Sequence, residues 1–148
     1  MNRKKYLKGL EDEHYAVKRL FTELEDIVER KKISDVKALK EKFARLKDML
    51  VEHVHSEDEV FYKDLRAKAV DMDQDALIPA LDFFRNSMHK VTGDVDAFFK
   101  EYADEKDILE NTGRFADRFK AIRDEILQRI ASEEGSLFYI YRAYFFDE

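Results

Sequence analysis

HVHSEDEVFY, residues 53–62, lies in the middle of the longest helix that the sequence predicts. On an α-helix, His53 and Glu57 lie one turn apart and point the same way, so an imidazole nitrogen and a carboxylate can converge on one cation. This spacing alone is weak evidence, because His and Glu four residues apart also occur on polar helix faces. The periodicity of the residues around the pair therefore decides which way it faces.

Apolar residues before the pair repeat at steps of three and four and place it on a buried face. This seam consists of Val36, Leu39, Phe43, Leu46, Leu50, His53, Glu57, Val60 and Asp64. His55 and Glu59 have the same spacing, but their face is predicted to be solvated. That face also carries Asp48, Glu52, Asp58 and Tyr62. Burying a carboxylate without a positive partner is costly, so a cation is expected beside Glu57.

The composition indicates a single soluble domain over residues 1–148. Hydrophobic residues make up 45% of the chain, with Phe 12 and Tyr 7, which is enough apolar surface for a sizeable core. The net charge of -6, with both signs interspersed, argues against nucleic acid as the main partner. The chain has no cysteine, which excludes thiolate metal sites and iron–sulfur clusters. Without an apolar signal or spanning segment, we expect a cytoplasmic protein that makes no membrane contact.

Long amphipathic helices are predicted for most of the chain. They run from about residue 2 to 32, from an N-cap at Ser34 to about residue 68, from a first turn at Pro79 to Tyr102, and continuously over 112–146. Breaks are predicted at residues 71–76 and 104–113, the second with room for a short helical turn. No strand-like alternation occurs. The predicted fold class is therefore all-α, an antiparallel up-down-up-down four-helix bundle.

Each predicted helix brings a polar side chain to the same level of this bundle. His14 occupies a seam position on the first helix, and Arg129 and Glu133 occupy seam positions on the last. His89 lies beside the third seam, about 100° round the helix from Met88. Counted from the nearest predicted turns, these residues lie roughly 17 to 20 positions along their helices, which is the same height at 1.5 Å per residue. The spacing predicts a polar layer across the core.

These polar positions, together with the motifs at residues 53–62 and 129–139, resemble the hemerythrin-like HHE cation-binding domain family over nearly the whole chain. In that family four antiparallel helices hold a non-haem di-iron centre. The resemblance implies iron as the cofactor, as one or two non-haem ions, and a small diatomic molecule as partner; other divalent metals also suit such ligands. The implied metal ligands are His14 and His53 as terminal ligands, Glu57 and Glu133 as bridging ligands, and His89 on the second metal.

The chain also departs from the family pattern. Arg129 stands where the family has a histidine, and a guanidinium stays protonated and cannot bind a metal. One turn after His89, where the family often has a further ligand, the chain has Gly93, followed by Asp94. We therefore expect a single metal, or an asymmetric pair with one weak site.

Two function classes follow from these residues. The first is a non-haem metal-binding protein for oxygen or nitric oxide sensing or carriage, or for iron handling. The alternative is a metal-free scaffold or interaction module in which Arg129 replaces the charge of the metal and pairs with Glu57 and Glu133.

Catalysis is not indicated, since no nucleophile–base pair or phosphate loop is present. Ferritin-like oxidation chemistry is a weaker alternative, suggested by Glu11-x-x-His14 and Glu52-x-x-His55. It needs all its ligands to face inward, and the second of these pairs is predicted to face outward. The aromatic residues 138–146 are expected to pack the end of the bundle, with a homodimer contact through this segment as the alternative for any part left exposed.

Overall fold

The computed structural model describes residues 1–29 and 35–146, and within these ranges it contains helices and turns but no strand. The elements are α1 (Arg3–Glu29), α2 (Val36–Ser56), the π-helical turn η1 (Glu57–Phe61), α3 (Tyr62–Asp71), the 3-10 turn η2 (Asp75–Leu77), α4 (Ile78–Glu101), α5 (Glu105–Glu110), α6 (Thr112–Glu134) and α7 (Leu137–Phe145). The predicted all-helical fold is confirmed. No helix in the described ranges combines the length and apolar character needed to cross a bilayer.

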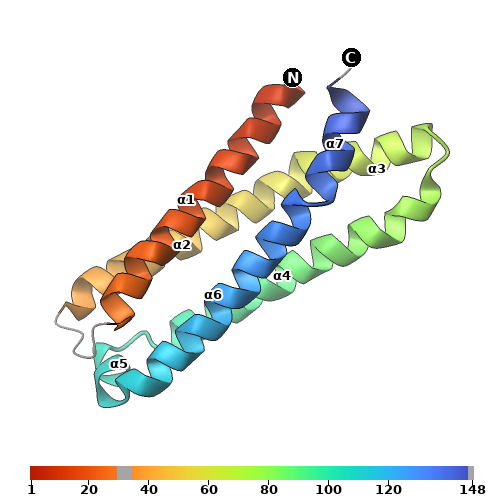
Figure 1. Cartoon of the computed structure of the whole chain (residues 1–148). Coiled ribbons are helices and arrows are strands. Elements are labelled where there is room, and N and C mark those ends of the chain that lie inside the picture. The colour runs from red at the N-terminus through yellow and green to blue at the C-terminus, as the bar shows by residue number, and fades with distance from the viewer. Residues whose placement is uncertain (30–34, 147–148) are drawn as a thin grey trace.

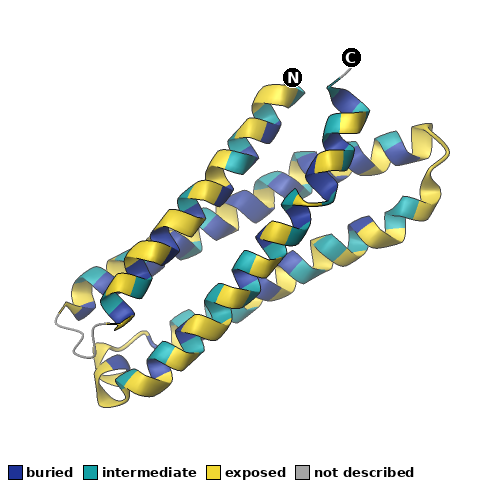
Figure 2. Cartoon of the chain, in the orientation of Figure 1, coloured by how far each residue is buried: buried dark blue, intermediate teal, exposed yellow. Residues whose placement is uncertain are grey.

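Four long helices enclose the core (Figure 1). Helix α1 packs against α2, α2 against α4, α4 against α6, and α6 returns to α1. Both termini lie at one end of the molecule, and the short helix α5 lies at the other. Each long helix turns one buried stripe inward and keeps its exposed face outside (Figure 2), as the predicted seams require.

The buried apolar side chains form two separate clusters. One surrounds Phe43 and Phe119 and fills the half of the bundle nearer α5. The other surrounds Phe61 and Tyr141 and fills the half nearer the termini. Along three of the four long helices the change from one cluster to the other falls at a buried polar residue, whereas on α4 the buried residue between the clusters is Met88. On α1, for example, Leu10 belongs to one cluster and Val17 to the other, and His14 lies between them.

Side-chain caps explain where α2, α5 and α6 begin. Asp35 begins α2, and its carboxylate accepts a hydrogen bond from the amide of Ala38. The predicted cap, Ser34, lies outside the described residues. Asp104 and Asn111 cap α5 and α6 in the same way, so the second predicted break does contain a short helix. Pro79 lies in the first turn of α4, as predicted.

The prediction of one continuous helix over residues 112–146 is wrong. The chain leaves the helical conformation at Ser136, with φ -136° and ψ -71°, and α7 begins at the next residue. Gly135, a poor helix former, precedes this break, and a Cβ there would lie 3.2 Å from the carbonyl oxygen of Ala131. The break allows α7 to pack on both α1 and α3.

The second predicted helix is also interrupted. In η1 the amide of Tyr62 donates to the carbonyl of Glu57, five residues earlier, so this turn holds one residue more than an α-helical turn. The extra residue shifts the buried face of everything that follows. Phe61, Tyr62 and Leu65 are buried, whereas Val60 and Asp64 are only partly buried. The predictions that Val60 and Asp64 continue the seam and that Tyr62 is solvated are therefore wrong.

The C-terminal aromatic segment packs inside the bundle end, as expected. Phe138, Tyr141 and Phe145 are buried. The hydroxyl of Tyr144 donates to Gln74, in the turn after α3. Tyr139 remains 66% exposed. A homodimer contact through this segment stays a prediction.

Candidate metal centre

Four buried polar side chains converge in the layer between the two apolar clusters. They are His14 of α1, His53 of α2, Glu57 at the start of η1 and Glu133 near the end of α6. Each is at most 2% exposed. One nitrogen or oxygen from each lies within 4.8 Å of those of the other three. Among residues 1–29 and 35–146, this is the one group of three or more His, Asp or Glu side chains placed to hold a metal ion.

The atoms that face each other are all suitable ligands. The Nε2 atoms of His14 and His53 lie 3.0 Å apart. His53 Nε2 lies 3.0 Å from Glu57 Oε1, and His14 Nε2 lies 3.3 Å from Glu133 Oε1. Two imidazole nitrogens and two carboxylates therefore share one small space, which suits iron, manganese or zinc.

Two further carboxylates orient the imidazoles from behind. His14 Nδ1 lies 3.0 Å from Glu134 Oε1, and His53 Nδ1 lies 2.5 Å from Glu13 Oε2. An ionised carboxylate can only accept, so each Nδ1 carries a proton and donates it, which directs Nε2 toward the centre. The sequence analysis assigned no role to Glu13 or Glu134. The available signal was their position directly beside His14 and Glu133 in the chain.

The centre has more acceptors than donors. Glu57 Oε1, Glu57 Oε2 and Glu133 Oε1 are fully buried and have no hydrogen-bond partner among the described residues. The remaining oxygen, Glu133 Oε2, accepts from the hydroxyl of Tyr62 at 3.0 Å. Buried carboxylate oxygens without donors are costly unless a cation is close. The arrangement is therefore chemically a cation site.

The electrostatics of the centre agree with this shortage of positive charge. Burial raises the pKa of Glu57 well above its ordinary value, and the charge of Glu133 raises it further. Burial lowers the pKa of His53, but its hydrogen bond to Glu13 and the nearby charges of Glu57 and Glu133 outweigh that effect and raise the pKa to about 10. Without a metal, a proton on His53 therefore supplies positive charge to the centre.

The structure does not bring His89 into this group. Its side chain is 49% exposed, and its Nε2 lies 2.7 Å from Asp58 Oδ2. Met88 takes the buried position on this turn of α4, so the neighbouring histidine lies on the outer flank of the helix. Asp58 also accepts a hydrogen bond from Arg85, at 3.1 Å.

Arg129 does not supply the missing charge either. It is partly buried, and within the described residues it forms no ion pair with Glu57 or Glu133. Ile130 takes the core position beside it. His55 and Glu59, by contrast, are exposed as predicted.

The comparisons with known proteins gave one match. The family model described as hemerythrin HHE cation binding domain matches residues 6–141, a range that contains all four converging side chains. No curated protein and no solved structure matched the chain.

Proposed function

Because the chain belongs to the hemerythrin HHE cation-binding domain family, we propose that it binds a non-haem metal ion, with iron favoured, through His14, His53, Glu57 and Glu133. One observation supports this most directly: three buried carboxylate oxygens beside two imidazole nitrogens have no hydrogen-bond partner in the part of the chain that the structure describes. A divalent cation offers each of these atoms a partner at once. The preference for iron rests on the family, since the ligand types also suit manganese and zinc.

We also infer that residues 1–148 form one hemerythrin-like domain with up-down-up-down topology. The closed sequence of contacts from α1 through α2, α4 and α6 supports an antiparallel four-helix bundle. The position of the four ligands, midway between the two apolar clusters, supports a single domain organised around its polar layer.

The function we propose for the bound ion is reversible binding rather than catalysis. An ion held by four protein atoms keeps an open position for a small molecule, which suits oxygen or nitric oxide sensing or carriage. Iron handling without a small ligand is the other use of the same site. Tyr62 and Phe138 shield the centre. Tyr62 donates a hydrogen bond to Glu133, and the ring of Phe138 stacks on that of His14 with 5.2 Å between the ring centroids.

A metal-free scaffold is the competing proposal, and one contact favours it: His14 Nε2 and His53 Nε2 lie 3.0 Å apart, close enough for a proton on one ring to be shared with the other. The raised pKa of His53 means that a proton can take the place of a metal as the positive charge of the centre. In this scaffold the proton, rather than Arg129, balances the buried carboxylates.

Metal content separates the two proposals. Protein purified without added metal is measured by elemental analysis, before and after anaerobic incubation with ferrous iron. The same measurements on His53→Ala remove one ligand, and His55→Ala serves as the matched control, because His55 lies two residues away on the exposed face. We expect close to one iron per chain in the wild type and the control, and very little in His53→Ala. Little metal in all three proteins, even after incubation, would sink the metal proposal and leave the scaffold.

A further inference from the structure

The two carboxylate oxygens of Glu133 have different partners, and Tyr62 is one of them. Its buried hydroxyl lies 3.0 Å from Glu133 Oε2 and donates to it. The other oxygen, Oε1, faces His14 Nε2 at 3.3 Å. A carboxylate that bridges two metal ions gives one oxygen to each ion. In Glu133, one of the two oxygens already accepts a hydrogen bond from Tyr62.

We infer that Tyr62 restricts the centre to one metal ion by holding Glu133 as a one-oxygen ligand and occupying the side from which a second ion would bind. This inference rests on the proposed metal-binding function. Tyr62 acts as a positioning residue. Its hydroxyl donates a hydrogen bond to Glu133 Oε2, the oxygen that would otherwise be free to bind a second ion.

The π-helical turn explains how Tyr62 reaches this position. In a regular α-helix, a residue five positions after Glu57 would lie about 140° round the helix axis from it. In η1 the amide of Tyr62 bonds to the carbonyl of Glu57, which stacks the two residues on the same face. The extra residue of this turn thus brings the phenol beside the carboxylates.

Among residues 1–29 and 35–146, the surroundings of Tyr62 offer no histidine nitrogen for a second ion. His89 and Arg85, one turn apart on α4, both bond to Asp58 instead of facing the centre. Elsewhere in the described ranges, no other group of three or more His, Asp or Glu side chains is arranged to hold a metal. The second half of a two-metal site is therefore replaced by a phenol and by ion pairs near the surface.

Cobalt titration tests this inference. Metal-free protein is titrated with Co²⁺, bound metal is followed by visible absorption, and the bound ions are counted by elemental analysis after desalting. We expect one Co²⁺ per wild-type chain. In Tyr62→Phe the affinity should fall roughly 10–100-fold, as for other residues that orient metal ligands. The absorption spectrum of bound Co²⁺ should also change, because Glu133 is then free to turn or to bind through both oxygens.

Tyr141→Phe is the matched control. Tyr141 is also buried and donates its hydroxyl to a carboxylate, but that carboxylate is Asp64, outside the centre. This variant should keep the wild-type affinity and spectrum. Circular dichroism establishes that each variant is folded, and a wild-type count of two ions overturns the inference even if Tyr62→Phe does not fold.

The outcomes distinguish the inference from the proposed function. A wild-type protein that binds no Co²⁺ and no ferrous iron overturns both. Two Co²⁺ ions per chain with similar affinities overturn the inference and leave metal binding intact. The inference also fails if folded Tyr62→Phe matches Tyr141→Phe in affinity and spectrum.

Discussion

Glu13 of α1 accepts a hydrogen bond from His53 of α2, with a distance of 2.5 Å between Glu13 Oε2 and His53 Nδ1. Glu13 directly precedes His14, so the carboxylate that orients one imidazole is one peptide bond away from the other. Glu134 of α6 orients the other imidazole, His14, in the same way. The imidazoles are therefore held by carboxylates on neighbouring helices, and their orientation depends on how α1, α2 and α6 pack.

Replacing Glu13 by alanine is expected to weaken metal binding without unfolding the protein. The variant leaves every proposed ligand in place but removes the acceptor that fixes the His53 ring, and such changes cost roughly 10–100-fold in affinity. Competition with a coloured chelator measures the change. Asp12→Ala is the control, because Asp12 is exposed and bonds only to Lys8 among the described residues. Equal affinities in the two variants would show that Glu13 has no orienting role.

Arg129→Ala is expected to change the free energy of unfolding by less than about 1 kcal/mol, because Arg129 forms no ion pair with the buried carboxylates of the described residues. If Arg129 balanced the buried carboxylates, its loss would cost about 3–5 kcal/mol. Urea denaturation of the metal-free protein measures the difference. Arg123→Ala, on the same helix, is the comparison; it removes ion pairs to Glu25 and Asp124 and should cost more. A large loss in Arg129→Ala alone would restore the role that the sequence suggested.

Deletion of Val60 is expected to disrupt both the fold and the centre. It removes the extra residue of η1, so Phe61, Tyr62 and Leu65 turn by about 100° away from the core. The expected loss is at least about 3 kcal/mol in the free energy of unfolding, comparable to emptying a core position. Val60→Ala keeps the chain length and should cost less than about 1 kcal/mol, because Val60 is only partly buried. A deletion variant as stable as Val60→Ala would mean that the turn has no structural role.

Tyr6 is expected to make the protein less stable at high pH. Burial raises the pKa of Tyr6 to about 12, although its hydrogen bond to Ser56 opposes the shift. In the unfolded chain the pKa of a tyrosine is about 10. Its contribution to stability is therefore complete below pH 10 and is lost as the pH rises toward 12.

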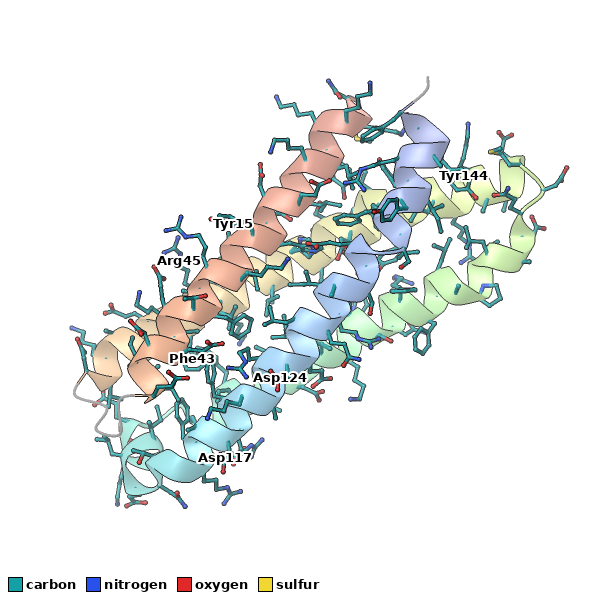
Figure 3. The ribbon with its side chains drawn as sticks, viewed as in Figure 1. Tyr15, Phe43, Arg45, Asp117, Asp124 and Tyr144 are labelled. Carbon is teal, nitrogen blue, oxygen red and sulfur yellow. The ribbon has the colours of Figure 1, made fainter. Side chains whose placement is uncertain are left out.

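Unfolding of the wild type, Tyr6→Phe and Tyr15→Phe at pH 9 to 12 tests this expectation. Tyr6→Phe should lose less stability over this range than the wild type does. Tyr15 is 62% exposed on the outer side of α1 (Figure 3), so Tyr15→Phe should follow the wild type. Identical pH profiles for the three proteins would contradict the assignment.

The sequence pattern was sufficient for the helices and for the four converging side chains. His14, His53, Glu57 and Glu133 continue apolar seams, and a period of 3.6 residues correctly predicts their burial. His89 could not be settled in this way, because a residue beside a seam can turn inward or outward. Its side chain turns outward, to Asp58.

The interruptions of the helices were missed because a fixed period counts every residue as the same rotation. One extra residue in η1 moves the seam from Val60 and Asp64 to Phe61 and Leu65. A signal was present, since Phe61, Leu65 and Ala69 form their own apolar series, one step out of phase with the residues before Glu57. Glu13 and Glu134 were missed for another reason: they reach sideways to neighbouring helices, and periodicity along one helix contains no information about such contacts.

The polar layer also affects how the protein opens. The two apolar clusters share no buried side chain, so we expect the two halves of the molecule to open as separate cooperative units, with amide hydrogens that exchange with solvent at different rates. Helix α1 contributes side chains to both clusters, and the chain passes from one cluster to the other where α2 continues into η1 and where α6 is followed by α7. An ion bound to all four converging residues couples the two opening events, so that protection in one half rises and falls with protection in the other. Metal binding is thus expected to replace the separate local opening of each half by one opening of the whole bundle.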